Sequence, residues 1–103
     1  MIRHIVMWKF RDGTRKEQEE FLSRLAGLYG VIPQLRRCEI LRGMGGADYD
    51  AVLLSEFESA EAPEAYKNDP RHKAVSALCK SIRVARAAVD CELPSPAPQP
   101  GDA

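Results

Sequence analysis

The segment IRHIVMWKF, residues 2–10, decides the fold of this 103-residue chain. Successive residues of a β-strand point to opposite faces, and here both sets are largely apolar. We therefore predict a strand that is covered on both sides, which a single layer of helices could not achieve. One face would carry His4, Val6, Trp8 and Phe10, and the other would carry Ile5, Met7 and Lys9.

The rest of the chain alternates between helical and strand-like patterns. Thr14 and Glu17 have the spacing of a capping box that opens a helix, and Gly30 is predicted to end it. One side of that helix would present Phe21, Leu22, Leu25, Leu28 and Tyr29. The glycine-rich residues 43–48 predict a hairpin loop. In chain order, we expect a helix over 14–29, strands over 35–41 and 49–57, helices over 59–66 and 69–81, and a strand over 82–92.

The last of these segments could form either of two structures. Its β-branched residues favour a strand, whereas its many alanines would also suit a helix. With a final strand, the order strand, helix, strand, strand, helix, strand predicts an α+β, ferredoxin-like fold. In that fold a four-stranded antiparallel sheet carries helices on one face. A second copy of the sheet is the simplest cover for the other face, so we predict a homodimer through the open sheet face, a dimeric α/β barrel.

Composition excludes several classes of function. Lysine plus arginine and aspartate plus glutamate number 15 each, so no overall field favours nucleic acid or an anionic membrane. Arg3, His4 and Lys9 interrupt the first apolar run, which fits neither a signal peptide nor a membrane span, and we expect a cytoplasmic protein. No cluster of Asp, Glu and His has metal-ligand spacing, so no metal is predicted.

One domain, residues 1–92, is expected, followed by a disordered tail over 93–103. The tail, LPSPAPQPGDA, contains four prolines and too little apolar surface to form a core. Cys38, Cys79 and Cys91 are odd in number and show no Cys-x-x-Cys spacing, which is typical of reduced packing thiols.

The segment YKNDPRH, residues 66–72, holds the candidate chemistry. Asp69 is placed as a helix N-cap and Pro70 as the first helical residue, which puts His72 in the first turn. The positive end of the helix dipole would lower the pKa of His72 and favour a neutral base, although the Asp69 carboxylate would act in the opposite direction. Tyr66 could donate a hydrogen bond to a developing oxyanion.

The same residues also have a purely structural interpretation. A histidine after Asp-Pro is common in the first turn of a helix, and a tyrosine can be an ordinary core residue. His4, at the start of a buried strand, is more typical of a hydrogen-bonded core histidine than of a base. Arg86, in the last predicted strand, could meet a ligand carboxylate, or it could form an interface ion pair or reach solvent.

Four segments together resemble the stress-responsive dimeric α/β-barrel (Dabb) family. The resemblance covers residues 2–92 and is most specific in the Tyr66 to His72 block. It rests on HIVMWKF (4–10), YDAVL (49–53) with EFES (56–59), YKNDPRH (66–72) and VDCE (89–92). The resemblance implies a ferredoxin-like protomer whose sheet pairs with that of a second subunit. The family includes plant stress proteins and a polyketide cyclase.

The resemblance also implies a site. In the polyketide cyclase of this family the matching histidine is the base and the matching tyrosine assists, which assigns catalytic roles to His72 and Tyr66. Trp8 replaces a smaller residue of that cyclase, and Ala51 stands where it has a further histidine. The expected substrate-binding residues are His4, Val6, Trp8, Phe21, Leu22, Leu25, Leu53, Val75 and Arg86.

Three functions remain open from the sequence. The first is a cofactor-independent cyclase or lyase acting on a polyketide-like β-dicarbonyl substrate, whose acidic protons need few catalytic groups. The second is a non-catalytic dimer that binds a small apolar ligand or contributes to stress tolerance. The third is a cofactor-independent monooxygenase, found on similar dimeric barrels.

Overall fold

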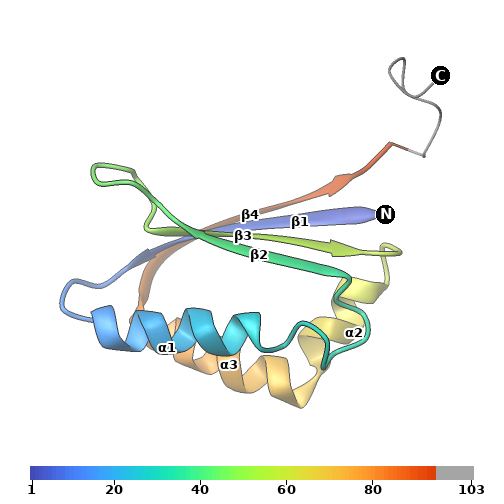
Figure 1. Cartoon of the computed structure of the whole chain (residues 1–103), viewed down its shortest axis with the longest axis horizontal. Coiled ribbons are helices and arrows are strands. Elements are labelled where there is room, and N and C mark those ends of the chain that lie inside the picture. Colours follow the sequence, from blue (N-terminus) through green and yellow to red (C-terminus); the bar gives the residue numbers. More distant parts are fainter. Residues whose placement is uncertain (95–103) are drawn as a thin grey trace.

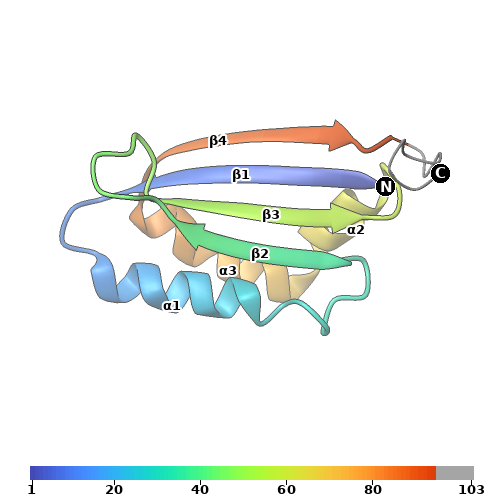
Figure 2. The same cartoon turned by 45° about the horizontal axis from the view of Figure 1, so that its top comes forward.

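A computed structural model describes residues 1–94 of the chain. Four strands form one antiparallel sheet in the order β2-β3-β1-β4, and the helices pack on one of its faces (Figures 1 and 2). This confirms the predicted ferredoxin-like α+β fold, including the final strand. The elements are β1 (Ile2–Phe10), α1 (Arg15–Ala26), β2 (Arg37–Arg42), β3 (Ala51–Phe57), α2 (Ala62–Asn68), α3 (Pro70–Ile82) and β4 (Arg83–Glu92).

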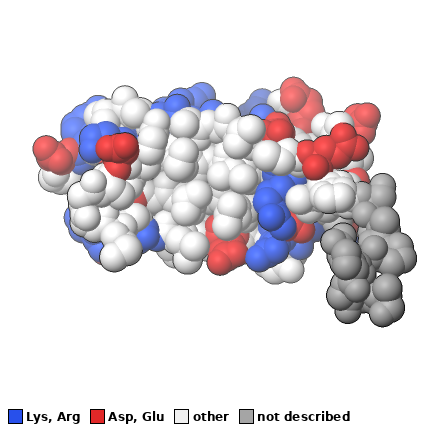
Figure 3. Space-filling view, turned by 90° about the horizontal axis from the view of Figure 1, so that it is seen from above, with Lys and Arg blue, Asp and Glu red and all other residues white. Residues whose placement is uncertain are grey.

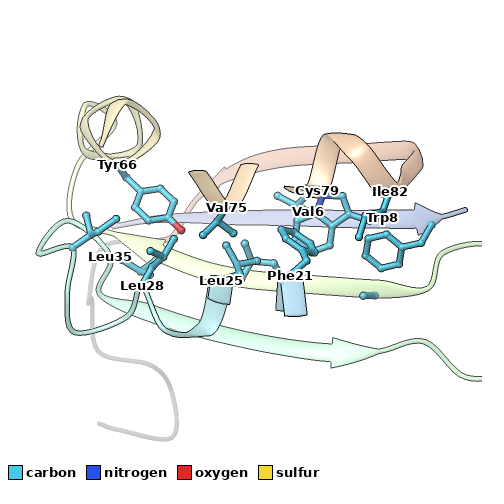
Figure 4. Close-up of a cluster of buried hydrophobic side chains, with 14 of the residues drawn as sticks. Val6, Trp8, Phe21, Leu25, Leu28, Leu35, Tyr66, Val75, Cys79 and Ile82 are labelled. Atoms are coloured by element: carbon cyan, nitrogen blue, oxygen red, sulfur yellow. The ribbon is translucent and has the colours of Figure 1, made fainter. Parts of the chain in front are cut away.

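The core lies between the sheet and helices α1 and α3 (Figure 4). Alternate residues of β1 face the helices and are buried, and Trp8 is only 4% exposed. Its ring meets Phe21 of α1 edge to face, with centroids 5.1 Å apart. Val75, Cys79 and Ile82 of α3 are buried on the other side of this cluster.

The opposite face of the sheet is also apolar and has no helix over it. Ile5 lies between Leu54 of β3 and Val89 of β4, and Met7 lies between Val52 and Ala87. Val89 is 53% exposed, and Leu41, next to Val52, is 49% exposed. Neutral side chains cover most of the middle of this outer face (Figure 3). The prediction that β1 is apolar on both faces is therefore correct.

Ion pairs mark one end of the outer face. Glu56 of β3 lies 2.8 Å from Arg3 and 3.1 Å from Arg37, which also approaches Glu39 at 3.1 Å. These four residues lie on three neighbouring strands, and Arg3 and Arg37 both stand opposite Glu56 in the register. The apolar middle of the outer face thus has a charged border at this end.

The first helix starts after Thr14 as predicted, but its predicted capping box and its predicted end are wrong. Helix α1 ends at Ala26, and the chain then turns, so that Leu28 and Ile32 are buried while Tyr29 is 54% exposed. Gly30, with φ +85, lies within this turn and does not end the helix. No capping box forms, because the Thr14 hydroxyl donates to the Arg11 carbonyl and accepts from the Gln18 side chain.

Two further details follow the sequence more closely. The loop between β2 and β3 is the predicted hairpin, and it needs glycine at position 43. A Cβ there would lie 2.5 Å from the carbonyl oxygen of Tyr49.

Beyond β4, the Leu93 N–H donates to the Met1 carbonyl at 2.9 Å, and residues 95–103 of the predicted tail lie outside the described residues. No helix within residues 1–94 is long and apolar enough to cross a bilayer.

Candidate active site

A cavity of about 590 Å³ lies between the sheet and α3 and reaches α1 and α2. Its volume is in the range of small-molecule sites. All the predicted site residues line it except Leu22, which is half-buried and packs against the edge of the core. The residues that it brings together are His4, Val6, Trp8, Phe21, Leu25, Leu53, Tyr66, His72, Val75 and Arg86.

The break between α2 and α3 places Tyr66 against His72. Asp69 is extended, with φ −65 and ψ 131, so the chain changes direction between the two helices. Its carboxylate accepts from the Arg71 backbone N–H at 2.8 Å, which confirms the predicted N-cap before Pro70. As a result, the rings of Tyr66 and His72 lie with centroids 4.5 Å apart and planes inclined by 57°.

His72 has the surroundings of a neutral base. Burial lowers its pKa, and the nearby charges of Lys67 and His4 act in the same direction, while a hydrogen bond to the Lys67 backbone and the charge of Asp69 raise it. Burial is the largest of these effects. Among the described residues, the buried Nδ1 atom has no hydrogen-bond partner. His72 lines the cavity, and a neutral imidazole can accept a substrate proton on a ring nitrogen.

Tyr66 has the surroundings of a permanent hydrogen-bond donor. It is 4% exposed, and burial raises the pKa of its phenol well above the usual range, so the hydroxyl keeps its proton. The side chain reaches inward from α2, with its oxygen directed toward Leu28 and Val75 (Figure 4). A protonated phenol under the sheet can stabilise negative charge that develops on a carbonyl oxygen.

His4 lines the same cavity and has a partner that sequence reasoning missed. Its Nδ1 contacts a carboxylate oxygen of Asp90, which stands directly opposite it on β4. Because a carboxylate accepts hydrogen bonds, Nδ1 donates and the other ring nitrogen is left free. His4 is therefore a hydrogen-bonded histidine of the buried face, as the structural interpretation expected, and it also borders the cavity.

Basic side chains from three elements complete the lining. Arg86 stands opposite Trp8 in the register, so both lie on the helix-facing side of the sheet. The other four, Lys67, Lys73, Lys80 and Arg83, were not predicted from the sequence. They come from α2, α3 and β4, and no local pattern reveals that these segments meet. Within residues 1–94, no group of three or more His, Cys, Asp or Glu side chains could hold a metal ion.

Comparisons with known proteins give the chain a family context. A family model described as Stress responsive A/B Barrel Domain (Dabb) matches residues 2–93. An uncharacterised protein of Streptomyces coelicolor is 30% identical over 87 residues, which are 80% of this chain and 90% of that protein.

Solved structures support the same fold. A dimeric ferredoxin-like protein of unknown function from Thermobifida fusca is 27% identical, with a TM-score of 0.79 over 89% of this chain and 90% of that chain. A hydroxynitrile lyase from Passiflora edulis has a TM-score of 0.81 over 94% of this chain and 96% of its own. Its identity of 14% shows a shared fold alone.

Proposed function

The protein belongs to the Stress responsive A/B Barrel Domain (Dabb) family, and we propose that it is a cofactor-independent cyclase or lyase acting on a polyketide-like β-dicarbonyl compound. The observation that carries the proposal is the pairing of His72, whose pKa is lowered by burial, with the protonated phenol of Tyr66 in the wall of the cavity. The activity would resemble that of olivetolic acid cyclase, the family member whose histidine and tyrosine match these two positions.

In the proposed reaction, His72 takes a proton from the carbon between two carbonyl groups. The electron pair left behind forms an enolate, and Tyr66 donates a hydrogen bond to its oxygen. The enolate carbon then attacks a third, more distant carbonyl carbon of the same molecule, which forms a carbon–carbon bond and an alkoxide. The imidazolium of His72 returns its proton to the alkoxide, so the ring is neutral again and no redox partner is needed.

The cavity itself supports a small, mainly apolar substrate. Val6, Trp8, Leu25 and Leu53 supply apolar walls. Burial of the reacting atoms strengthens every hydrogen bond made to developing charge. A substrate with an apolar part beside its carbonyl groups therefore fits the cavity.

The proposal includes a homodimer through the outer face of the sheet. Ile5, Met7, Leu54 and Val89 form an apolar surface there, bordered at one end by the ion pairs of Glu56. Such a surface is stabilised when a second copy removes it from water. The related Thermobifida fusca protein is dimeric.

A non-catalytic ligand-binding dimer is the second candidate, because a cavity lined by apolar side chains can serve storage or protection without any proton transfer. A protein with this function would bind its ligand without any proton transfer by His72. The two functions are separated by measuring product and binding in the same set of variants.

The experiment follows the cyclised product of synthetic 3,5,7-trioxo thioesters, in which C2 can attack C7 to close a six-membered ring, by liquid chromatography and mass spectrometry. Replacement of His72 by Gln should lower kcat by about a hundredfold or more, and Tyr66→Phe should lower it less, because a general base and one donor contribute unequally. Lys16→Gln, an exposed change on α1, is the control and should keep wild-type turnover. Unchanged turnover in His72→Gln would reject catalysis by this residue.

A further inference from the structure

The cavity has an uneven charge that its proposed chemistry does not use. Its lining contains five basic side chains and, in the part of the chain that the structure describes, no aspartate or glutamate. None of the five forms an ion pair with an acidic residue among positions 1–94, although Arg3, Arg37 and Arg71 elsewhere are all paired. Cations that have no acidic partner beside an apolar cavity are available to bind an anion.

Three of the cations converge at one end of the cavity. Lys80 lies in the last turn of α3, and Arg83 and Arg86 follow on β4. All three lie close enough to the buried thiol of Cys79 for their charges to lower its pKa against the stronger raising effect of burial. We call Lys80, Arg83 and Arg86 the basic cluster. The charge of Lys80 also interacts favourably with the negative end of the α3 dipole. Arg86 lies on a strand, where no helix dipole explains its position.

The basic cluster lies well away from the proposed base. His72 is in the first turn of α3 and Cys79 is in its last two turns, and seven residues of helix span roughly 10 Å. Between them, the cavity wall is made mainly of apolar side chains, including Val75, Val6 and Trp8. The shape therefore suits a ligand with an apolar body about this long and a negative group at one end.

We propose that this cavity binds amphiphilic anions, with a carboxylate or phosphate held by Lys80, Arg83 and Arg86 and the apolar or reactive part extending toward Tyr66 and His72. The inference rests on the proposed function in using the same cavity, but it does not depend on catalysis. It specifies the substrate class, an acyclic carbonyl compound with an anionic terminus. It also favours one orientation, because three of the five basic side chains form the basic cluster, whereas two, Lys67 and Lys73, lie near His72.

The test compares ligands that share a tail and differ in head group. Decanoate, decyl phosphate and 1-decanol are titrated below micelle-forming concentrations. Binding is followed by the fluorescence of Trp8, the only tryptophan of the chain, which lines the cavity. At least one of the two anions should bind roughly tenfold more tightly than decanol, as expected for a charge-assisted contact. Added salt should weaken anion binding and leave decanol unaffected.

Variants assign the effect to the basic cluster. Arg86→Gln should remove most of the preference for the anion without changing the affinity for decanol, Arg86→Lys should restore part of it, and Arg24→Gln on α1 should leave it unchanged. If Arg86→Gln no longer binds decanol, Lys80→Gln makes the same comparison in a different element. Equal affinity for the anions and decanol, or a preference that survives both Gln substitutions, would overturn the inference.

The outcome is independent of the proposed reaction, since none of the three ligands is a β-dicarbonyl. His72→Gln should keep the preference for decanoate over decanol, because the basic cluster is intact. If that variant loses turnover while the wild type shows no preference for anions, then the basic cluster has no role in binding and the proposed catalysis stands. If anion binding follows Arg86 while His72→Gln remains fully active, the catalytic proposal alone fails.

Discussion

At the scale of single residues, the imidazole of His72 connects folding with chemistry. The environment that keeps the ring neutral for catalysis also makes its protonation unfavourable in the folded state. Its pKa is below the ordinary value of 6.5 when folded and returns to that value on unfolding. At pH values well above 6.5 the ring is neutral in both states and has no effect on stability. As the pH falls below this value, the unfolded chain takes up the proton first, and the folded state loses stability.

We therefore expect the free energy of unfolding of the wild type to fall more steeply than that of His72→Gln between about pH 7 and about pH 5. Urea unfolding at a series of pH values measures this difference. His4, Lys67 and Asp69 also influence the ring, but they are common to both proteins, so the comparison isolates His72. Parallel pH profiles for the two proteins would show that burial does not depress this pKa.

Residue-level features were predictable where the signal is local. Asp69, Pro70 and His72 are close in the chain, and capping rules alone placed the histidine in the first turn of a helix. The partnership of His4 with Asp90 was not predictable, since it depends on the register between the first and last strands. Arg86 was predicted as a ligand-binding residue, but its convergence with Lys80 and Arg83 was missed for the same reason, because these residues belong to different elements.

At the scale of elements, the break between α2 and α3 sets the geometry of the site. Asp69 ends one helix and caps the next, and hydrogen bonds from Arg71 lower its pKa to about 2, so it remains ionised. Removing its side chain should destabilise the start of α3, and it should also loosen the position of His72 relative to Tyr66.

Asp69→Ala is expected to lower Tm by roughly 4–8 °C, the effect of losing an ordinary N-cap in a domain of this size. Asp69→Asn should keep most of the wild-type Tm, because asparagine caps equally well, while the loss of charge lowers the pKa of His72 further. Calorimetry measures the Tm of both variants. NMR titration of the imidazole measures the pKa of His72 in Asp69→Asn. A Tm for Asp69→Ala equal to that of the wild type would show that the cap is dispensable.

Element boundaries were less predictable than element types. The apolar periodicity of α1 continues through Leu28, yet the helix ends at Ala26. The turn that follows buries both Leu28 and Ile32. This burial comes from tertiary packing, so the helical spacing of apolar residues does not predict where the helix ends. Leu22 illustrates the same limit within a helix, since it neighbours Phe21 in sequence but does not reach the cavity.

At the scale of the whole molecule, the outer face of the sheet should determine the state of association. Ile5→Glu places a charge at the middle of that face without touching the helix-facing core, because the side chain of Ile5 points away from it. We expect the wild type to be a dimer and this variant to be a monomer by sedimentation equilibrium. Lys9→Glu, on the same face at the far end of β1, is the control and should remain dimeric. A monomeric wild type would exclude the proposed pairing.

The position of β4 beside β1 has a consequence for synthesis. The central strand, made first, receives one of its two neighbours from a segment about 80 residues later in the chain, a separation that slows folding. On the ribosome, the nascent chain must therefore wait with one edge of β1 unpaired until residues 83–92 have emerged. Chaperones that shield exposed strand edges would act on this protein during that interval, before either the cavity or the outer face is complete.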